Sequence, residues 1–404
     1  MDFEDDPDTA AYRAEVRAWL TANAPSPDES AAWQTEAGLL SAARAWQASK
    51  AVGGYAAITV PRAYGGSGLG PSQMVVYRQE EARFQVPFGV YEIGLGMCVP
   101  TLLALGSPNI CERYVPSAVS GQEIWCQLFS EPGAGSDLAA LRTRAERRDG
   151  GWVVNGQKVW TTGAQFSDFG LLLARTDPGV PKHAGLTLFI LDMRSAGVEV
   201  RPIRQMSGGA EFNEVFLTDV FIPDQQRLTP PGEGWKGARV TLMFERLNVG
   251  GDIGLMDHRG LLARARGLAI DGRPAVEDPA FRERLARWHV ADRGLKLLNF
   301  RTLTALGKGE TPGPEQSLAK LVIASQAQEM ANYLLDLRDE EGALCGDALG
   351  ADWTPVERAW SMGAGMRIAG GTDEILRNII SERVLGLPAE PRFDQSTPFD
   401  QSSS

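Results

Sequence analysis

The residue best suited to proton chemistry is Glu245, because it interrupts the largely apolar run 240–244 and is followed directly by Arg246. A carboxyl group in a partly desolvated place has a raised pKa, since burial disfavours its charged form. A pKa nearer neutrality is what a general base requires. From the residues alone, however, a solvated Glu245–Arg246 pair at the edge of a helix is the simpler explanation.

Other catalytic devices have little support in the sequence. The chain has only 3 histidines and contains neither H-E-x-x-H nor G-x-S-x-G, so we expect no metal hydrolysis and no acyl-serine chemistry. Gly133-Ala134-Gly135 would place the third glycine of a dinucleotide-binding motif at Leu138, which argues against a Rossmann site. The 4 cysteines lie far apart without a C-x-x-C pair, so no disulfide framework and no structural metal are expected.

Composition places the chain among globular proteins. Of its 404 residues, 43% are hydrophobic and 23% are charged, and the length predicts two or three packed regions. Lys plus Arg number 40 against 51 Asp plus Glu, and a net charge of −11 argues against a nucleic-acid partner. No apolar stretch approaches the roughly 18 residues of a membrane span. The acidic N-terminus resembles neither a secretory nor a transit segment, so we expect a cytoplasmic protein.

Hydrophobic periodicity changes twice along the chain. Helical spacing prevails at both ends, whereas short apolar runs in the middle alternate with hairpin signals such as Gly150-Gly151 and Asn155-Gly156. Strands spaced this closely indicate an antiparallel barrel or sandwich. The predicted fold is α+β with an N-terminal helical domain (1–124), a middle antiparallel β-barrel domain (125–232), a C-terminal helical bundle (233–390) and a flexible polar tail (391–404). Phe-Asp-Gln-Ser occurs twice in that tail.

Three short segments are more distinctive together than any one of them is alone. They are Q-L-F-S-E-P-G-A-G-S-D (127–137), N-G-Q-K-V-W-T-T (155–162) and G-G-T-D-E-I-L-R-N-I-I (370–380). In this order and spacing they resemble the acyl-CoA dehydrogenase family of flavoproteins, and weaker likeness covers nearly the whole chain. The resemblance implies FAD as cofactor, an acyl-CoA thioester as substrate, and a helical, β-barrel, helical domain order.

The first two segments also make physical sense as a flavin site. A flavin ring needs hydrogen bonds at its polar edge and flat apolar cover on one face. Main-chain groups near Phe129 and Ser130 can supply the bonds, and Trp160 can supply the cover. Without the resemblance, the same residues would be a glycine-rich turn beside a core tryptophan. The expected cofactor-binding residues are Gln127, Phe129, Ser130, Gly135, Ser136, Trp160, Thr162, Thr372 and Glu374, with Ser136 also able to face the thioester.

The third segment bears on the catalytic base. Many family members carry the base carboxylate just before the Gly-Thr of this segment, where this chain has Gly370. Other members carry it in a Glu-Arg pair on a helix of the C-terminal domain, which Glu245-Arg246 matches. The resemblance therefore implies Glu245 as base and Arg246 as a residue that orients the substrate or Glu245. The Gly370 N–H keeps a role as donor to the thioester oxygen.

Two family features are missing, both at the adenine end of FAD. An Arg-x-x-Phe-Gly stretch is absent where the chain reads G-L-A-I-D-G-R-P (267–274), and three acids (339–341) replace a glycine-rich turn. Consecutive acids would repel a pyrophosphate. A non-identical second subunit could donate the missing pieces, or a homo-oligomer could use other contacts such as Arg273. Both arrangements stay open at this point.

The resulting hypothesis is an acyl-CoA dehydrogenase that forms a trans-2-enoyl-CoA and passes electrons to an electron-transfer flavoprotein. The alternatives are a flavin-dependent acyl-CoA oxidase and a non-catalytic partner subunit of a heteromeric dehydrogenase. Fatty acids and steroid side chains are both possible substrates. The absence of a side chain at Gly370 favours branched, long or ring-bearing acyl groups.

Overall fold

The computed structural model describes residues 5–249, 256–307, 313–348, 350–391 and 396–401. The chain forms two compact units, which are treated separately below. The first unit comprises residues 1–204, 210–245 and 391–404, and the second comprises 205–209 and 246–390.

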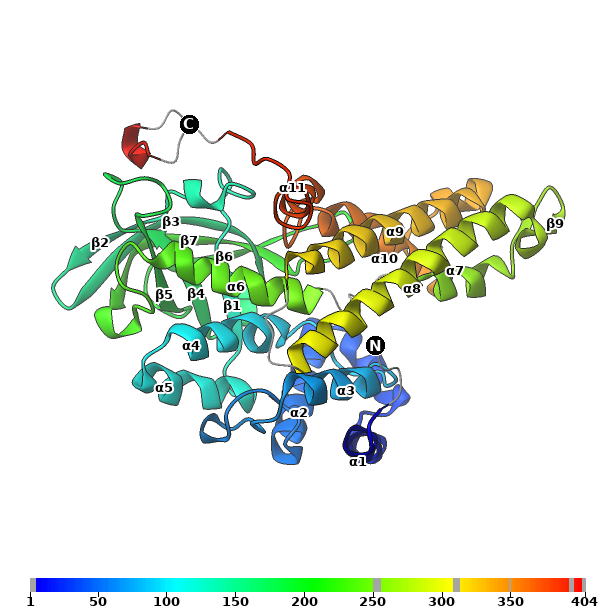
Figure 1. Cartoon of the computed structure of the whole chain (residues 1–404), viewed down its shortest axis with the longest axis horizontal. Helices are drawn as coiled ribbons and strands as arrows, with labels where there is room; N and C mark the ends of the chain where they lie inside the picture. The colour runs from blue at the N-terminus through cyan, green and yellow to red at the C-terminus, as the bar shows by residue number, and fades with distance from the viewer. Residues whose placement is uncertain (1–4, 250–255, 308–312, 349, 392–395, 402–404) are drawn as a thin grey trace. The chain divides into compact units, whose positions relative to one another are not determined.

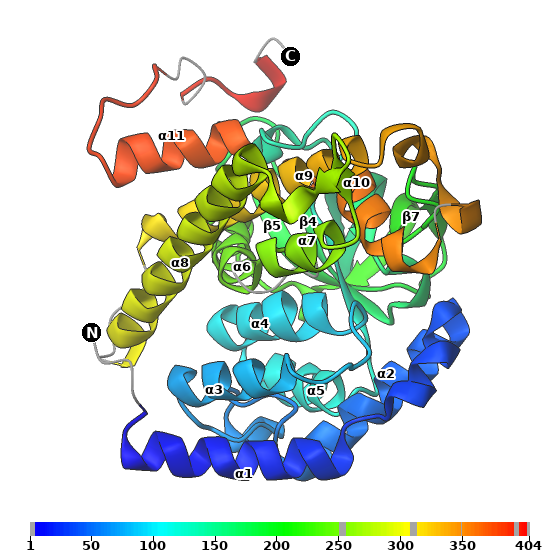
Figure 2. The same ribbon diagram turned by 90° about the vertical axis from the view of Figure 1, so that its right-hand side faces the viewer.

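Helices make up the N-terminal part of the first unit. They are α1 (Pro7–Asn23), α2 (Glu36–Gly53), α3 (Pro71–Glu81), α4 (Val99–Leu105) and α5 (Pro108–Val119), with a π-helical turn at Gly94–Cys98 before α4. Figure 2 shows α1 alongside α3, and the two helices are in contact. On α5, Ile110, Tyr114 and Ala118 follow each other at four-residue intervals and are buried, so one face of this helix enters the core.

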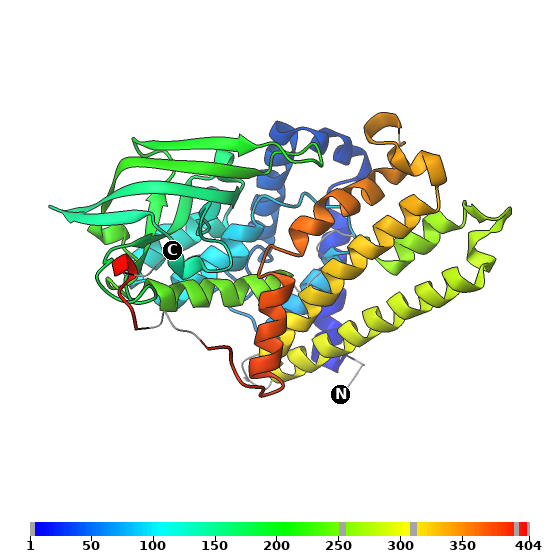
Figure 3. The same cartoon turned by 90° about the horizontal axis from the view of Figure 1, so that it is seen from above.

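A single sheet follows the helices and carries the segment 125–223. Its strands are β1 (Trp125–Leu128), β2 (Arg144–Arg148), β3 (Gly151–Thr162), β4 (Phe169–Arg175), β5 (Leu186–Asp192), β6 (Val198–Ile203) and β7 (Phe212–Pro223). They are ordered β1-β4-β2-β3-β7-β6, and β5 pairs with β4 (Figures 1 and 3). Every residue of β4 is buried, which fits its central position.

The prediction of an antiparallel barrel is wrong for this sheet. β1 runs parallel to β4, with Trp125 opposite Phe169, so the sheet is mixed. Within the described residues no pairing joins β6 to β1 or β5, and the sheet stays a curled, open half-barrel. The pattern of apolar residues could not reveal the parallel pair, because strand direction depends on the connection between β1 and β4, about 40 residues of chain.

The predicted turn at Asn155-Gly156 is also wrong. The hairpin between β2 and β3 turns at Gly150, which has φ +77°, while Asn155 and Gly156 lie inside β3. The register of β3 against β7 shifts at this point, which marks a β-bulge. A Cβ atom at Gly156 would lie 2.3 Å from Thr143 Oγ1, so glycine is required by a close approach and not by a turn.

The second unit is built from helices around α9. Its elements are α7 (His258–Ala265), β8 (Ala269–Ile270), β9 (Arg273–Pro274), α8 (Pro279–Gly307), α9 (Ser317–Asp336), α10 (Thr354–Met366) and α11 (Asp373–Arg383). Helices α7, α8, α10 and α11 all contact α9, and α9 and α10 run side by side in Figures 1 and 3. Phe281, Trp288 and Met330 belong to its core. The helical prediction for this part of the chain is confirmed.

One further helix, α6 (Gly234–Val249), begins in the first unit and ends in the second. No helix within the described ranges is long and apolar enough to cross a membrane.

Of the predicted flexible tail (391–404), residues 391 and 396–401 are described, while 392–395 and 402–404 lie outside the described residues. Residues 396–401 lie against the loop between β4 and β5, where the Phe399 N–H donates to the Val180 carbonyl at 2.9 Å. The physical reason is an aromatic ring in an otherwise polar segment, since Phe399 covers the Arg175 guanidinium.

Candidate functional site

Two of the predicted flavin segments meet in the first unit. The turn after β1 contacts β3, because the Val159 N–H donates to the Ser130 carbonyl at 3.0 Å. The Lys158 ammonium donates to the Phe129 carbonyl at 2.9 Å. Phe129 and Ser130 are thereby held beside the strand that carries Trp160 and Thr162. Because both carbonyl oxygens already accept a hydrogen bond, the ligand-binding capacity of this turn lies mainly in its donors, including the Ser130 hydroxyl.

The buried ion pair of Lys158 and Glu131 holds this turn in place. Lys158 has no exposed side-chain surface, and its ammonium lies 2.8 Å from Oε1 of Glu131, which is 8% exposed. Glu131 also accepts the N–H groups of Arg142 and Thr143 at 2.6 and 2.9 Å. Each oxygen of the carboxylate therefore has a partner, which is the condition under which a buried charge is tolerated.

The pKa values of this pair reflect the same balance. Burial lowers the pKa of Lys158 to about 8, although the attraction of Glu131 works in the opposite direction. For Glu131, burial raises the pKa, but the charge and hydrogen bond of Lys158, together with the hydrogen bonds from Thr143 and Arg142, outweigh it, so the pKa of this carboxyl is lowered. We therefore describe the pair as charged near neutral pH.

Arg175 holds the far side of the same loop. It is 4% exposed, and its guanidinium donates to the carbonyl oxygens of Ala139, Leu141 and Lys182 at 2.6, 3.1 and 3.2 Å. Five N–H donors in a fixed plane suit this task, because they can bind several carbonyls at once. The loop 129–143 is thus anchored at both ends by buried cations.

Trp160 has the most unusual backbone of the predicted residues. Its φ is +60°, in the left-handed region that bulky residues rarely enter, and its side chain is 59% exposed. The register of β3 shifts between Lys158 and Thr161, and the Phe212 ring meets the indole edge-on at 5.9 Å. Strain of this kind persists where the surrounding structure enforces it, often at functional sites. The bulge presents a flat aromatic face beside the anchored turn.

The remaining first-unit residues divide into an exposed glycine-rich segment and two half-buried strand positions. A Cβ atom at Gly133 or Gly135 would meet no atom within 4 Å, and Gly135, Ser136 and Asp137 are exposed. Asp137 is paired with Lys182 at 2.7 Å. Gln127 is half-buried on β1 opposite Leu171, and Thr162 is half-buried opposite Phe212. The segment predicted to approach cofactor and thioester is therefore accessible at its glycines and anchored on either side.

Glu245 lies on the packed face of α6. Gly237, Thr241 and Glu245 are spaced by four residues, so they share one side of the helix. Thr241 is fully buried and accepts a hydrogen bond from the Thr101 hydroxyl of α4 at 3.0 Å, while a Cβ at Gly237 would collide with Leu188. Glu245 is half-buried at the end of this face. This position differs from the solvated helix edge that the residues alone allow. The Arg246 side chain lies outside the described part of the structure.

The third motif forms a glycine turn before α11 in the second unit. Gly370 and Gly371 have φ values of +65° and +99°, so a side chain at either position would be strained. Lys320 of α9, 3% exposed, donates to the Gly371 carbonyl at 2.7 Å. Thr372 caps α11 by accepting the Ile375 N–H, the interaction typical of a helix N-terminus.

Glu374 completes this turn at the surface. It is exposed in the first turn of α11, where its pKa is lowered by backbone and Thr372 hydrogen bonds. A negative charge near a helix N-terminus is favourable, so Glu374 remains ionised there.

Sequence reasoning assigned no role to the buried cations Lys158, Arg175 and Lys320 or to Glu131. Glu131 and Lys158 both lie inside the quoted motifs, and their opposite charges are the signal that could have paired them. Arg175 and Lys320 carry no comparable signal, because their partners are main-chain carbonyls. Within the described residues, no group of three or more His, Cys, Asp or Glu side chains is arranged to hold a metal ion.

Comparison with known families accounts for nearly the whole chain. Models described as the N-terminal, middle and C-terminal domains of acyl-CoA dehydrogenase match residues 6–122, 126–220 and 232–385. The chain belongs to the acyl-CoA dehydrogenase family. Members of this family are FAD-containing oxidoreductases, and a structure of similar fold, PigA, is described with FAD and proline.

Curated acyl-CoA dehydrogenases resemble the chain over most of its length. IpdE1 of Mycobacterium tuberculosis is 35% identical over 394 residues, which cover 95% of this chain and 99% of IpdE1. FadE34 of the same organism is 39% identical over 333 residues, covering 80% of this chain but 43% of FadE34. The present chain therefore matches less than half the length of FadE34.

Solved structures of the family share the fold. A structure described as the Tcur3481-Tcur3483 steroid ACAD has a TM-score of 0.80 and 25% identity, covering 96% of this chain and 100% of that one. The ChsE4-ChsE5 complex from Mycobacterium tuberculosis has a TM-score of 0.79 and 25% identity over the same shares. Both names describe complexes of two different proteins.

Proposed function

We propose that this acyl-CoA dehydrogenase oxidises an acyl-CoA thioester to the trans-2-enoyl-CoA, with Glu245 as base and an electron-transfer flavoprotein as electron acceptor. The observation that carries the proposal is the position of Glu245 on the buried Gly237–Thr241 face of α6. A carboxylate at the end of a packed face is partly removed from water, and such a place suits a general base.

The first unit fits the isoalloxazine ring of FAD. The exposed Trp160 indole offers a flat face, and the turn at Phe129 and Ser130 offers hydrogen-bond donors next to it. The open space around Gly133 and Gly135 admits a ligand close to the backbone. When bound, FAD supplies the acceptor for the hydride that leaves the β-carbon. Gln127 and Thr162 would complete the ring site from β1 and β3.

Proton removal falls to the chain's own residues. The Glu245 carboxylate accepts the proton from the α-carbon, and the Gly370 N–H stabilises the negative charge that develops on the thioester oxygen. Lys320 supports this donor, because its bond to the Gly371 carbonyl holds the glycine turn that carries the Gly370 N–H. Ser136 and Arg246 would orient the substrate. Thr372 and Glu374 are proposed to contact the phosphate and ribose region of the cofactor.

Bulky, ring-bearing acyl groups are the substrates we favour. With φ at +65°, Gly370 is in a conformation that disfavours any side chain, so the space near the α-carbon stays free. The similar Tcur3481-Tcur3483 structure is described as a steroid enzyme, which supports the same class of substrate.

A second acyl-CoA dehydrogenase-like subunit is the partner we favour. The three acids Asp339, Glu340 and Glu341 are exposed in a short 3-10 helix, a poor place for a pyrophosphate. Two similar structures are described as pairs of different proteins. A homo-oligomer with other contacts, such as Arg273 on the β8–β9 hairpin, is the alternative arrangement.

The substitution Glu245→Gln tests the catalytic assignment. It should leave bound flavin absorbance intact and lower the rate of flavin reduction by acyl-CoA by about 10²- to 10⁴-fold, because the base is lost. Glu233→Gln at the start of the same helix is the matched control, since its pair with Lys236 is exposed. Retained flavin reduction in the Glu245 variant would sink the assignment of the base.

The same preparation separates the alternative activities. Reduction of an electron-transfer flavoprotein without hydrogen peroxide formation identifies a dehydrogenase, whereas peroxide produced from oxygen identifies an oxidase. A chain that binds flavin only when co-expressed with a second subunit, and whose Glu245→Gln variant leaves turnover of that complex unchanged, would be the non-catalytic partner.

A further inference from the structure

The segment 396–401 is bound to the middle of the first unit by main-chain contacts. The Phe399 N–H donates to the Val180 carbonyl at 2.9 Å, and the Asp400 N–H donates to the Pro178 carbonyl at 3.1 Å. Pro398 forms an isolated antiparallel bridge with Pro181. The short helix at this end of the chain lies beside the sheet in Figures 1 and 3. These contacts add a short strand-like stretch to the β4–β5 loop, a mode of binding that depends little on side chains.

The Phe399 ring supplies the side-chain specificity. It lies 3.5 Å from the centre of the Arg175 guanidinium and 5.9 Å from that of Arg142. A cation over an aromatic face is held more strongly where water is excluded, and Arg175 is 4% exposed. Asp400, in contrast, has an exposed side chain and takes part through its main chain.

Arg175 connects the tail to the candidate site. Its guanidinium binds the carbonyls of Ala139 and Leu141, which follow the exposed segment Gly135–Asp137 in the chain. It also binds the carbonyl of Lys182, whose ammonium pairs with Asp137. The ring of Phe399 therefore covers a buried side chain that ties the β4–β5 loop to the loop 135–142, beside the Lys182–Asp137 pair.

We propose that the C-terminal segment 396–401 is a strap that positions the loop 135–142 for the acyl-CoA thioester. Phe399 keeps the Arg175 guanidinium in the plane in which it binds three carbonyls, and the main-chain bonds to Pro178 and Val180 keep the β4–β5 loop, with Lys182, in place. The inference rests on the proposed function for its effect on substrate. It makes Phe399 a positioning residue and not a catalytic one.

Three variants test the strap. Phe399→Ala removes the ring, Phe399→Tyr keeps an aromatic face, and Asp400→Ala changes the neighbouring exposed side chain as a matched control. In the protein without substrate, Phe399→Ala should speed amide hydrogen exchange at Arg142 and Thr143, whose N–H groups bind Glu131, by about tenfold. In turnover it should raise KM for acyl-CoA by about tenfold with kcat within about twofold. Phe399→Tyr and Asp400→Ala should behave like the parent.

Each result decides the matter. An unchanged rate of amide hydrogen exchange in Phe399→Ala would overturn the strap. Faster exchange with an unchanged KM would also overturn it, since the contact of segment 396–401 would then support the fold but not substrate binding. An equal effect of Asp400→Ala would also overturn it, because the ring would not be the determinant. If the parent oxidises no acyl-CoA, the proposed function fails, while the exchange measurement still reports whether the strap holds the loop.

Discussion

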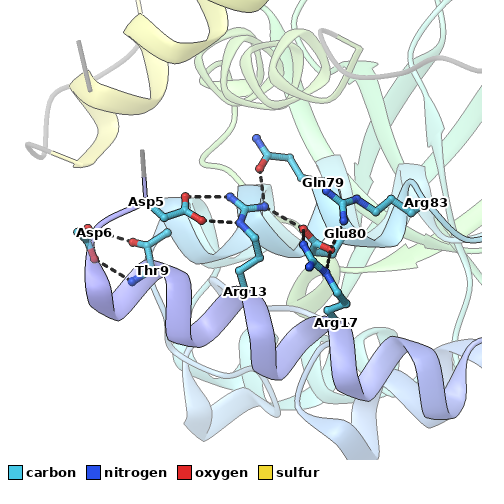
Figure 4. A network of polar contacts seen from close by, with 8 residues as sticks. All are labelled: Asp5, Asp6, Thr9, Arg13, Arg17, Gln79, Glu80 and Arg83. Carbon is cyan, nitrogen blue, oxygen red and sulfur yellow. Dashed lines mark hydrogen bonds and ion pairs between the residues drawn. The ribbon is translucent and has the colours of Figure 1, made fainter. Parts of the chain in front are cut away.

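Two buried carboxylates in the first unit are neutralised in different ways. Glu80 of α3 has no exposed side-chain surface and binds Arg13, Arg17 and Arg83 at 3.1, 2.9 and 3.1 Å (Figure 4). The arginine side chains themselves are 21%, 51% and 57% exposed, so the cations of this network lie at the surface. Two of them come from α1, and the network therefore fastens α1 to α3.

Glu131 is surrounded by partners that cannot reach water. Its cation, Lys158, is fully buried, and its other donors are the main-chain N–H groups of Arg142 and Thr143. Lys158 donates a second hydrogen bond to the Phe129 carbonyl. This network fastens a loop to a strand, and the loop leads to exposed glycines with empty space around them.

The comparison teaches that a buried charge does not by itself mark a functional site. Both carboxylates have lowered pKa values and complete sets of partners. What separates them is the part of the chain that they hold: a helix in one case, a ligand-accessible turn in the other. A site is indicated where buried charge is used to fix main-chain groups whose neighbours remain exposed.

The largest expected effect follows from Lys158→Met. This substitution removes the cation from a buried carboxylate and should lower the free energy of unfolding by about 3–5 kcal/mol, with loss of flavin from any folded protein. Urea unfolding and flavin content measure the two consequences. Arg287→Met is the control, since its pair with Glu283 is exposed and should contribute no more than about 1 kcal/mol. Equal losses in both variants would contradict the distinction drawn between anchored and exposed pairs.

An intermediate effect is expected for Lys320→Met in the second unit. It removes one charge-assisted hydrogen bond to the Gly371 carbonyl, worth about 1.5–3 kcal/mol. Because the bond fixes the turn that carries the Gly370 N–H, kcat for acyl-CoA oxidation should fall with little change in flavin content. Lys296→Met provides the control, as Lys296 is 42% exposed and pairs with Asp292 on the same helix. A kcat equal to that of the parent in Lys320→Met would show that the glycine turn does not depend on the bond from Lys320 for catalysis.

The spacing of hydrophobic residues predicts those parts of the fold that depend on neighbouring residues in the sequence. The order of helices, strands and helices follows from periodicity, and the meeting of Phe129 and Ser130 with the Trp160 strand follows from the motifs. The parallel pairing of β1 with β4 was missed, because it depends on contacts distant in sequence. The turn predicted at Asn155-Gly156 is wrong for the same reason, a contact distant in sequence. The Asn155 side chain donates to Asp219 of β7 across the sheet, and Asn155 stays within β3.

The candidate site was predicted as a set of residues but not as a supported structure. Nothing in the sequence says that Lys158 is buried, since lysine is usually exposed and its partner Glu131 lies 27 residues away. The backbone strain at Trp160 is equally hidden, because it arises from a register shift between two strands. Main-chain partners leave no trace in side-chain patterns, which is why Arg175 and Lys320 were overlooked.

The smallest effect on activity is expected for Glu80→Gln, and its effect on stability depends on pH. The hydrogen bonds from Arg17 and Arg13, with the charge of Arg83, lower the pKa of Glu80 below its usual value of 4.5, although burial opposes them. Its stabilisation is therefore complete above that value and is lost as pH falls through the lower folded-state pKa. At pH 7, Glu80→Gln should lower the free energy of unfolding by about 1.5–3 kcal/mol, and this difference should shrink towards zero below pH 4.5.

Urea unfolding of parent and variant across this pH range measures the difference, with Glu283→Gln as the exposed control. Flavin content and kcat should not change in Glu80→Gln, because the network holds α1 against α3 and carries no residue of the candidate site. A loss of activity without loss of stability would place Glu80 among the residues that support the site. The Glu80 network would then serve function as the Glu131 network is proposed to do, and the contrast between them would fail.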